Sequence, residues 1–447
     1  MKYLKLLIFV LISSFSKAQP AKYVLHNIIE AVSEHRLNKD IKTLANFGTR
    51  HTLSDTLSNT RGIGAARRWI KTEFETISKK CNNCLEVFYQ KNLVKLGENN
   101  RITKDVLVVN VVAIQRGTKH PNRYIIMSGD IDSRVSDPNN FISDSPGAND
   151  NATGMAGTLE SARVLSNYSF GSSIVYVGLS GEEQGLFGGK GLAEFALKNK
   201  WDIAAVLNND MIGNIIGVDG VIDNRTFRIF SEPVPANETD QQRKSRRYYG
   251  GEVDGNSRQL ARYIQNTVQT YMPEMNPMMV YRLDRFGRGG HHRPFNDVGF
   301  AGVRIMEAHE NYTQQHQDIR EENGIKYGDT FEHVYMPYVK KLTAVNAINL
   351  ASLAWAPPGP NNVGIGGFVK PSVVLEWDAI SDAIGYKIYW RDTTSPNWEH
   401  SRYITGVTKF KLDGIVIDNS FFGVASVGVN GFESPVCFPN KIIRDKN

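Results

Sequence analysis

The chain has 447 residues, of which 41% are hydrophobic and 10% aromatic, so it can form a sizeable core and is not a disordered protein. Its length favours two domains. A net charge of +6 with scattered basic residues argues against a nucleic-acid partner. The densest basic run, residues 243–249, is short and flanked by acidic stretches, so we expect a solvated loop there.

The first 18 residues predict a signal peptide. Two early lysines precede an apolar run from Leu6 to Phe15, and the small residues Ser16 and Ala18 precede the expected cleavage site. This apolar run is too short to span a membrane comfortably, and no later stretch approaches the length of a membrane helix. We therefore expect an exported protein, secreted, periplasmic or at the cell surface, with no membrane span. In such a compartment Cys81 and Cys84 are expected to form a local disulfide.

The middle of the chain alternates between two kinds of periodicity. Residues 19–80 show the apolar spacing of helices. Strands are then expected over 106–114, 123–129, 172–180, 203–210 and 300–307, and helices over 153–166, 186–199, 257–271 and 338–355. This order predicts an α/β fold, a three-layer sandwich around a mostly parallel sheet, over residues 19–355.

The periodicity changes at a Pro/Gly-rich segment, residues 356–362, which predicts a linker. The short strands and turns beyond it predict an all-β sandwich over residues 363–447. Trp377 and the strands over 386–392 and 421–429 make this region resemble a fibronectin type III module. It carries no catalytic constellation, so we expect it to contact another protein or a polymer, or to support the larger domain.

Candidate chemistry is concentrated in five short segments, residues 128–134, 146–154, 178–189, 207–213 and 289–299. Three of them lie at the end of a predicted strand or directly after one, where α/β folds bind ligands. Together they supply Asp130, Asp132, Asp150, Glu182, Glu183, Asp210 and His292. Carboxylates and a histidine are ligands for divalent metals, and one carboxylate remains to act as a base.

The segments PGANDNATG, SGEEQGLFGG, NNDMIG and HHRPFNDVG, in this order, resemble the di-zinc exopeptidases of the bacterial leucyl aminopeptidase type. Glutamate carboxypeptidases and glutaminyl cyclases belong to the same superfamily. The resemblance covers residues 40–355 and implies a zinc aminopeptidase that acts on peptides or proteins. By position, Asp150 would bridge two zinc ions, Glu183 and His292 would complete one, and Asp210 would bind the other. Glu182 would be the general base that takes a proton from the attacking water.

One position departs from the family pattern, which reads His-x-Asp where this chain has Asp130-Ile131-Asp132. Asp132 matches the supporting carboxylate. Asp130 replaces a histidine ligand, and we expect it to bind the second zinc through oxygen, with Arg134 offsetting the added charge. Two zinc ions per chain are expected, with one as the alternative. His291 is expected to face solvent or substrate.

Two other functions fit the same residues. A glutaminyl-cyclase-like enzyme would transfer the acyl group without water and with a single zinc. A non-catalytic peptide-binding protein could use the same scaffold. Counting zinc ions and assaying for pyroglutamate distinguishes the first alternative, and a lack of hydrolysis across a broad peptide panel would indicate the second.

Overall fold

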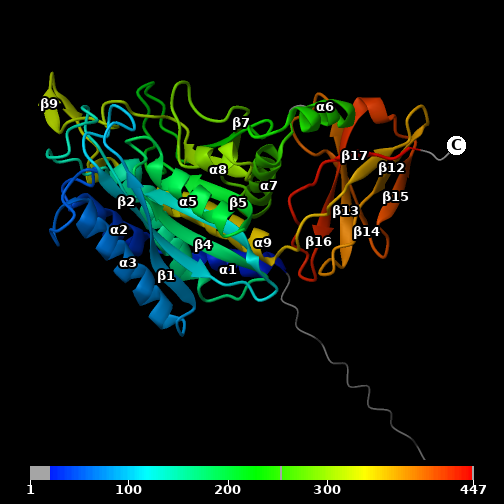
Figure 1. Ribbon diagram of the computed structural model, residues 1–447, viewed down its shortest axis with the longest axis horizontal. Helices are drawn as coiled ribbons and strands as arrows, with labels where there is room; N and C mark the ends of the chain where they lie inside the picture. Colours follow the sequence, from blue (N-terminus) through cyan, green and yellow to red (C-terminus); the bar gives the residue numbers. More distant parts are fainter. Residues whose placement is uncertain (1–20, 252–253, 445–447) are drawn as a thin grey trace, which may run out of the picture.

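The structure is a computed structural model that describes residues 21–251 and 254–444 (Figure 1). The predicted signal peptide, residues 1–18, lies outside the described residues. One large sheet with helices on both faces forms the body of the protein, and two smaller sheets form a lobe beside it (Figure 1). No helix in the described part is both long and apolar enough to cross a membrane.

The large sheet has eight strands in the order β1-β2-β4-β3-β5-β8-β6-β7. Its centre is parallel, because β4, β3, β5 and β8 all run in one direction, while β1, β2 and β6 introduce antiparallel pairs. The strands are β1 (Leu85–Val94), β2 (Val106–Gln115), β3 (His120–Asp130), β4 (Ser172–Leu179), β5 (Asp202–Asn209), β6 (Thr226–Ser231), β7 (Asn276–Val280) and β8 (Gly302–Glu307). The predicted α/β fold with a mostly parallel sheet is confirmed.

Helices cover the sheet on both faces, because neighbouring residues of a strand point to opposite sides. In β3, Ile125 and Met127 pack into the larger core, whereas Tyr124 and Ile126 pack into the smaller one. The larger core contains residues of α1 (Ala21–Ala31), α2 (Glu34–Ala45), α3 (Gly62–Lys80), α4 (Gly154–Leu165), α7 (Asn256–Tyr271) and α9 (Met336–Trp355). The smaller core contains residues of α5 (Phe187–Lys198) and α8 (Arg293–Asp297). Strands buried on both sides explain the continuous apolar runs in the sequence.

The basic run at residues 243–249 is helical, so the expectation of a loop is wrong. It belongs to α6 (Asp240–Tyr249), which begins with a capping box between Thr239 and Gln242. No residue of α6 is buried. The helix therefore has no apolar stripe, which is the signal that would have predicted it.

The C-terminal lobe packs two sheets around Trp377, Ile388 and Val424. One sheet contains β11 (Gly364–Gly366), β12 (Ser372–Glu376), β15 (Lys409–Asp413) and β17 (Lys441–Ile442), and the other contains β13 (Gly385–Asp392), β14 (His400–Ile404) and β16 (Ser420–Val427). The likeness to a fibronectin type III module stays a prediction. The lobe contacts the body through a buried ion cluster, in which Asp254 pairs with Arg262 at 2.6 Å and also with Arg391. The predicted disulfide between Cys81 and Cys84 is present.

Candidate metal centre

The predicted acidic residues meet at one edge of the large sheet. β3, β4 and β5 are parallel neighbours, so their carboxyl ends lie together, with Asp130 opposite Leu179 and Gly129 opposite Asn209. Glu182 and Glu183 follow β4, and Asp210 follows β5 directly. Parallel pairing therefore gathers side chains that are up to 80 residues apart in sequence.

Asp150 reaches this edge through the turn that leads into α4. The turn lies tightly on the sheet, because a Cβ on Gly129 would stand 2.4 Å from the carbonyl carbon of Gly154. Asn151 anchors it further, since its Nδ2 donates to Asp130 Oδ2 and to the carbonyl oxygen of Asn209, both at 2.7 Å. These contacts hold Asp150 above the ends of β3 and β5.

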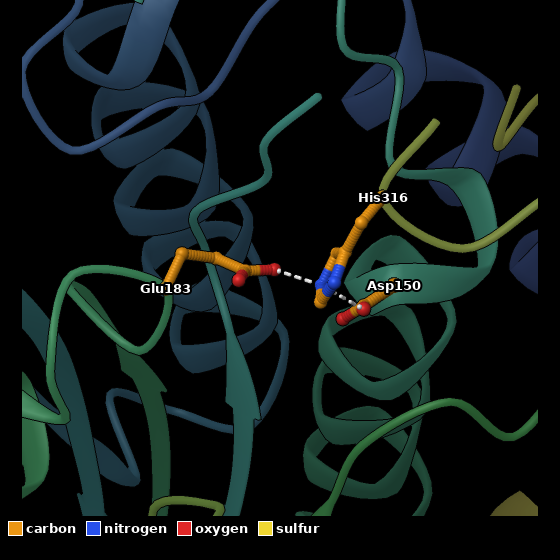
Figure 2. A group of neighbouring side chains, drawn as sticks. All are labelled: Asp150, Glu183 and His316. Atoms are coloured by element: carbon orange, nitrogen blue, oxygen red, sulfur yellow. Dashed lines mark hydrogen bonds and ion pairs between the residues drawn. The ribbon is translucent and has the colours of Figure 1, made fainter. Parts of the chain in front are cut away.

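Asp150, Glu183 and His316 form the most compact group of candidate ligands, called here the His316 group (Figure 2). One ligand atom from each residue lies within 4.8 Å of the other two. His316 Nε2 is 2.9 Å from Asp150 Oδ2 and 2.9 Å from Glu183 Oε1. Two carboxylates and an imidazole at such spacing match the ligand set of a zinc ion.

The imidazole of His316 carries a proton where a metal would bind. Burial lowers its pKa, but the carboxylates of Glu183 and Asp150 outweigh burial and raise the pKa to about 9. That value favours a fully protonated ring, whereas Arg134 Nη2 approaches Nδ1 to 2.6 Å and requires Nδ1 to accept. Nδ1 is therefore the acceptor, because two donors cannot share this distance. Both observations agree that Nε2 bears a proton between the carboxylates.

The sequence predicts His292 as the histidine ligand, whereas the structure brings His316 to the site. His316 lies in the loop between β8 and β9 (Arg320–Glu322). Strand β9 pairs with β10 (Ile325–Tyr327) in a small hairpin. The loop follows the carboxyl end of a parallel strand, as three of the five predicted segments do. This position is the available signal, but the residues next to the histidine, Gln315 and Gln317, are neither glycine nor acidic.

His292 does not join the His316 group. Its ring is buried, its Nε2 donates to the carbonyl oxygen of Leu283 at 2.8 Å, and Asp284 lies 3.6 Å from the same nitrogen. His291 is also fully buried, so the expectation that it faces solvent is wrong. Its Nδ1 lies 2.5 Å from Asp130 Oδ1. A histidine thus does stand beside Asp130, but it comes from a different loop.

Asp132 shapes the loop that carries Glu182 and Glu183. Its carboxylate accepts hydrogen bonds from the backbone amides of Gly181, Glu182 and Glu183 at 2.8, 3.2 and 3.0 Å. Burial, followed by the nearby charge of Glu183, raises the pKa of Asp132 to about 6. Asp132 therefore acts as a positioning residue, because it fixes the backbone of both glutamates.

Glu182 has the surroundings of a base. In the described part of the chain no group donates a hydrogen bond to its carboxylate, which is half-buried next to the His316 group. Burial raises its pKa well above the usual range, and the charges of Glu183 and Asp210 raise it further. A raised pKa makes a carboxylate a stronger proton acceptor.

Asp130 and Asp210, called here the Asp130–Asp210 pair, are held by other residues. Asp130 accepts from Asn151 and contacts His291, while Asp210 Oδ2 lies 2.7 Å from Arg304 Nη2. Arg304 is fully buried and also pairs with Asp284 at 3.1 Å. Burial raises the pKa of both Asp130 and Asp210 to about 8.

Several buried atoms near this pair form no hydrogen bond among the described residues, namely Asp210 Oδ1, His291 Nε2, and Nε and Nη2 of Arg304. Unpaired buried polar atoms are costly unless a ligand or water satisfies them. The residues therefore fit a metal well at the His316 group. They offer further donors at the Asp130–Asp210 pair, where both oxygens of Asp130 but only Oδ2 of Asp210 already contact other residues.

Comparison with known proteins identifies the family of this chain. Residues 110–335 match the family described as peptidase family M28. A probable zinc metalloprotease of Pyrenophora tritici-repentis is 37% identical over 93% of this chain and 97% of its own length. Another, from Pyricularia oryzae, is 38% identical over 91% of this chain and 82% of its own length.

A solved structure shows the same fold. The LapA aminopeptidase of Legionella pneumophila superposes with a TM-score of 0.55 over 80% of this chain and 81% of its own, at 15% identity. The matched segment contains Asp130, Asp150, Glu182, Glu183, Asp210 and His316. On the family match and the long, closely similar relatives, the chain belongs to peptidase family M28.

Proposed function

We propose that this protein is an exported zinc aminopeptidase that removes N-terminal residues from peptides. The observation that carries the proposal is the convergence of Asp150, Glu183 and His316, with the unpaired carboxylate of Glu182 beside them. The names of the curated relatives support zinc, and the fold shared with an aminopeptidase supports the reaction. The Cys81–Cys84 disulfide supports export, because such bonds persist in oxidising compartments.

Asp150, Glu183 and His316 would hold the first zinc ion. When bound, zinc polarises a carbonyl group and lowers the pKa of water. Glu182 takes the proton from the attacking water and returns it to the leaving amine. Asp132 keeps Glu182 in place through the three backbone amides. Arg134 Nε, 2.8 Å from Glu183 Oε2, holds the ligand carboxylate.

A second zinc ion would use Asp150 together with the Asp130–Asp210 pair. It would compete with Arg304 for Asp210 and with Asn151 and His291 for Asp130. We therefore infer that the first ion binds tightly and the second more weakly. The C-terminal lobe, which lies outside this centre, would contact another protein or a polymer.

Substitution of Glu182 tests the proposal. Glu182→Gln keeps the shape but removes the base, so kcat should fall by about 10²–10⁴-fold while zinc content is unchanged. The assay compares hydrolysis of aminoacyl p-nitroanilides with zinc content measured by atomic emission. Glu194→Gln, at an exposed position of α5, is the matched control and should keep full activity. Undiminished hydrolysis by Glu182→Gln would rule out the mechanism.

The glutaminyl-cyclase alternative gains some support because one compact ligand group is found among the described residues. It predicts that an N-terminal glutamine peptide yields pyroglutamate and no free amino acid. Mass spectrometry of the products from one Gln-Ala-Ala peptide separates the two reactions. The aminopeptidase proposal expects free glutamine.

A further inference from the structure

The cavity above the His316 group has an unusual lining. It encloses about 250 Å³ and is bordered by Asp150, Glu182, Glu183, Asp210 and His316. Its remaining wall contains one large apolar side chain, Leu186, and five arginines: Arg101, Arg134, Arg285, Arg288 and Arg293. Pockets that select apolar side chains are lined mainly by apolar residues. This wall therefore does not suit a leucine or phenylalanine side chain.

Two of the arginines are already neutralised. Arg134 Nε lies 2.8 Å from Glu183, and Arg285 Nη1 lies 2.7 Å from Glu310. Arg288 is held more loosely, with Glu310 at 3.5 Å and the amide oxygen of Gln315 at 3.1 Å.

Arg101 and Arg293 have no carboxylate partner among the described residues. Arg101 Nη1 donates to the carbonyl oxygen of Glu183 at 2.6 Å. Arg293 Nη1 donates to the carbonyl oxygen of Arg288 at 3.3 Å, and its Nε is buried without a hydrogen-bond partner. Both side chains are partly covered, so their charges are less screened than those of fully exposed arginines.

The balance of charge in the cavity points to an anion. The five guanidinium groups of the lining are balanced by its four carboxylates and by Glu310 behind it, so the wall alone is close to neutral, and a bound divalent ion would add two positive charges next to Arg101 and Arg293. A planar guanidinium binds a carboxylate through paired hydrogen bonds, and these positive charges repel lysine and arginine side chains.

We propose that this cavity selects peptides that carry a carboxylate beside the scissile bond, with Arg293 as its main partner and Arg101 assisting. The inference rests on the proposed peptidase function and names its substrate class. The carboxylate can come from an acidic N-terminal side chain or from the free C-terminus of a short peptide.

Matched substrates distinguish these sources. The first arm compares Glu-p-nitroanilide with Gln-p-nitroanilide, which differ by one charge. The second arm compares Gln-Ala with Gln-Ala-amide, which differ only at the C-terminus. A charged hydrogen bond predicts a preference of about tenfold or more in kcat/KM for the carboxylate form in one arm. Equal rates within both arms would overturn the inference and leave the peptidase function intact.

Variants assign the preference to Arg293. Arg293→Gln should reduce the ratio to about threefold or less, and Arg293→Lys should restore part of it, because the charge returns without the paired geometry. Arg247→Gln, an exposed arginine of α6 outside this cavity, is the charge-matched control and should keep the full ratio. An unchanged ratio in Arg293→Gln would refute the assignment.

If no peptide is hydrolysed, the peptidase function itself is refuted. A binding measurement then still tests the anion site. Calorimetry on the zinc-loaded protein compares glutarate with glutaramate, each of which retains one carboxylate for the metal. Binding of glutarate that is tighter by about tenfold, and that weakens in Arg293→Gln, supports the anion site. Equal affinities would overturn it.

Discussion

The His316 group and the Asp130–Asp210 pair lie at the same edge of the sheet but differ in what holds their carboxylates. In the first, an imidazole bridges Asp150 and Glu183 at 2.9 Å, so the donors already face one point. In the second, Asp210 contacts the guanidinium of Arg304, and Asp130 contacts Asn151 and His291. Carboxylates alone do not make a metal site. What matters is whether the neighbouring residues hold the carboxylate oxygens around one point, as at the His316 group.

The comparison also explains the replacement at position 130. A histidine there would donate one nitrogen to a metal and the other to a carboxylate. Here the carboxylate is at 130 and the histidine at 291, and the two are in contact at 2.5 Å. A carboxylate and an imidazole are therefore still in contact, but the carboxylate comes from Asp130 and the imidazole from His291.

The largest expected effect comes from the two histidines. His316→Ala should weaken zinc binding by more than the 10–100-fold typical of residues that merely orient ligands, and should abolish hydrolysis. His292→Ala is the matched variant. It should lower stability, because its buried ring is lost, yet leave zinc affinity nearly unchanged. Competition with a fluorescent chelator measures the zinc affinity of both variants. A larger loss of affinity in His292→Ala than in His316→Ala would contradict the site.

A zinc titration sharpens the contrast between the two groups. We expect one tight ion followed by a weaker one, since the second must displace contacts to Arg304 and His291. Asp210→Asn should weaken only the second event. Calorimetric titration of the metal-free protein resolves the two events. Two ions of equal affinity would show that the contacts of Asp210 and Asp130 do not weaken binding of the second ion.

The stabilisation by zinc should grow with pH. Burial raises the pKa of Asp130 and Asp210 to about 8, above the value of an exposed aspartate. In the metal-free protein, the contribution of these two aspartates to the free energy of unfolding is fully present below about pH 4 and is lost as the pH rises through 8. Bound zinc compensates these charges. The increase in the free energy of unfolding on zinc binding should therefore be larger at pH 8 than at pH 5, by about 1.4 kcal/mol or more.

Calorimetric unfolding with and without zinc at the two pH values measures this difference. Asp130→Asn removes one of the two titrating groups and should reduce it. A stabilisation that does not vary between pH 5 and pH 8 would contradict the assignment.

A smaller effect is expected at Asp132. Asp132→Asn keeps the size but replaces one acceptor oxygen by a donor that faces backbone amides. Loss of one hydrogen bond to a charged group predicts a decrease in the free energy of unfolding of about 1.5–3 kcal/mol. Misplacement of Glu182 should lower kcat by about tenfold. Urea unfolding and steady-state kinetics measure the two effects, and unchanged kcat would show that these amides do not position the base.

Much of the fold could be predicted from the sequence, and the reasons are physical. The strands β2, β3, β4, β5 and β8 are buried on both faces, so their apolar runs are unambiguous. Strands at and near the edges, such as β1 and β7, were missed because exposed positions interrupt the apolar pattern. Helix α6 was missed because it buries nothing.

The site was predictable where chemistry and chain position coincide. Acidic residues directly after parallel strands, such as Asp130 and Asp210, can be located from the strands alone. His316 could not be chosen over His292 in this way, because it lies in the loop after β8, several residues beyond the end of the strand. The exchange between Asp130 and His291 likewise depends on contacts between segments 161 residues apart.

A crystal structure of the zinc-loaded protein, with an anomalous difference map at the zinc edge, would locate the metal directly. We expect the strongest peak between Asp150, Glu183 and His316, with a weaker peak beside Asp210 or none. A strongest peak in contact with His292, or one that leaves His316 unliganded, would contradict this expectation.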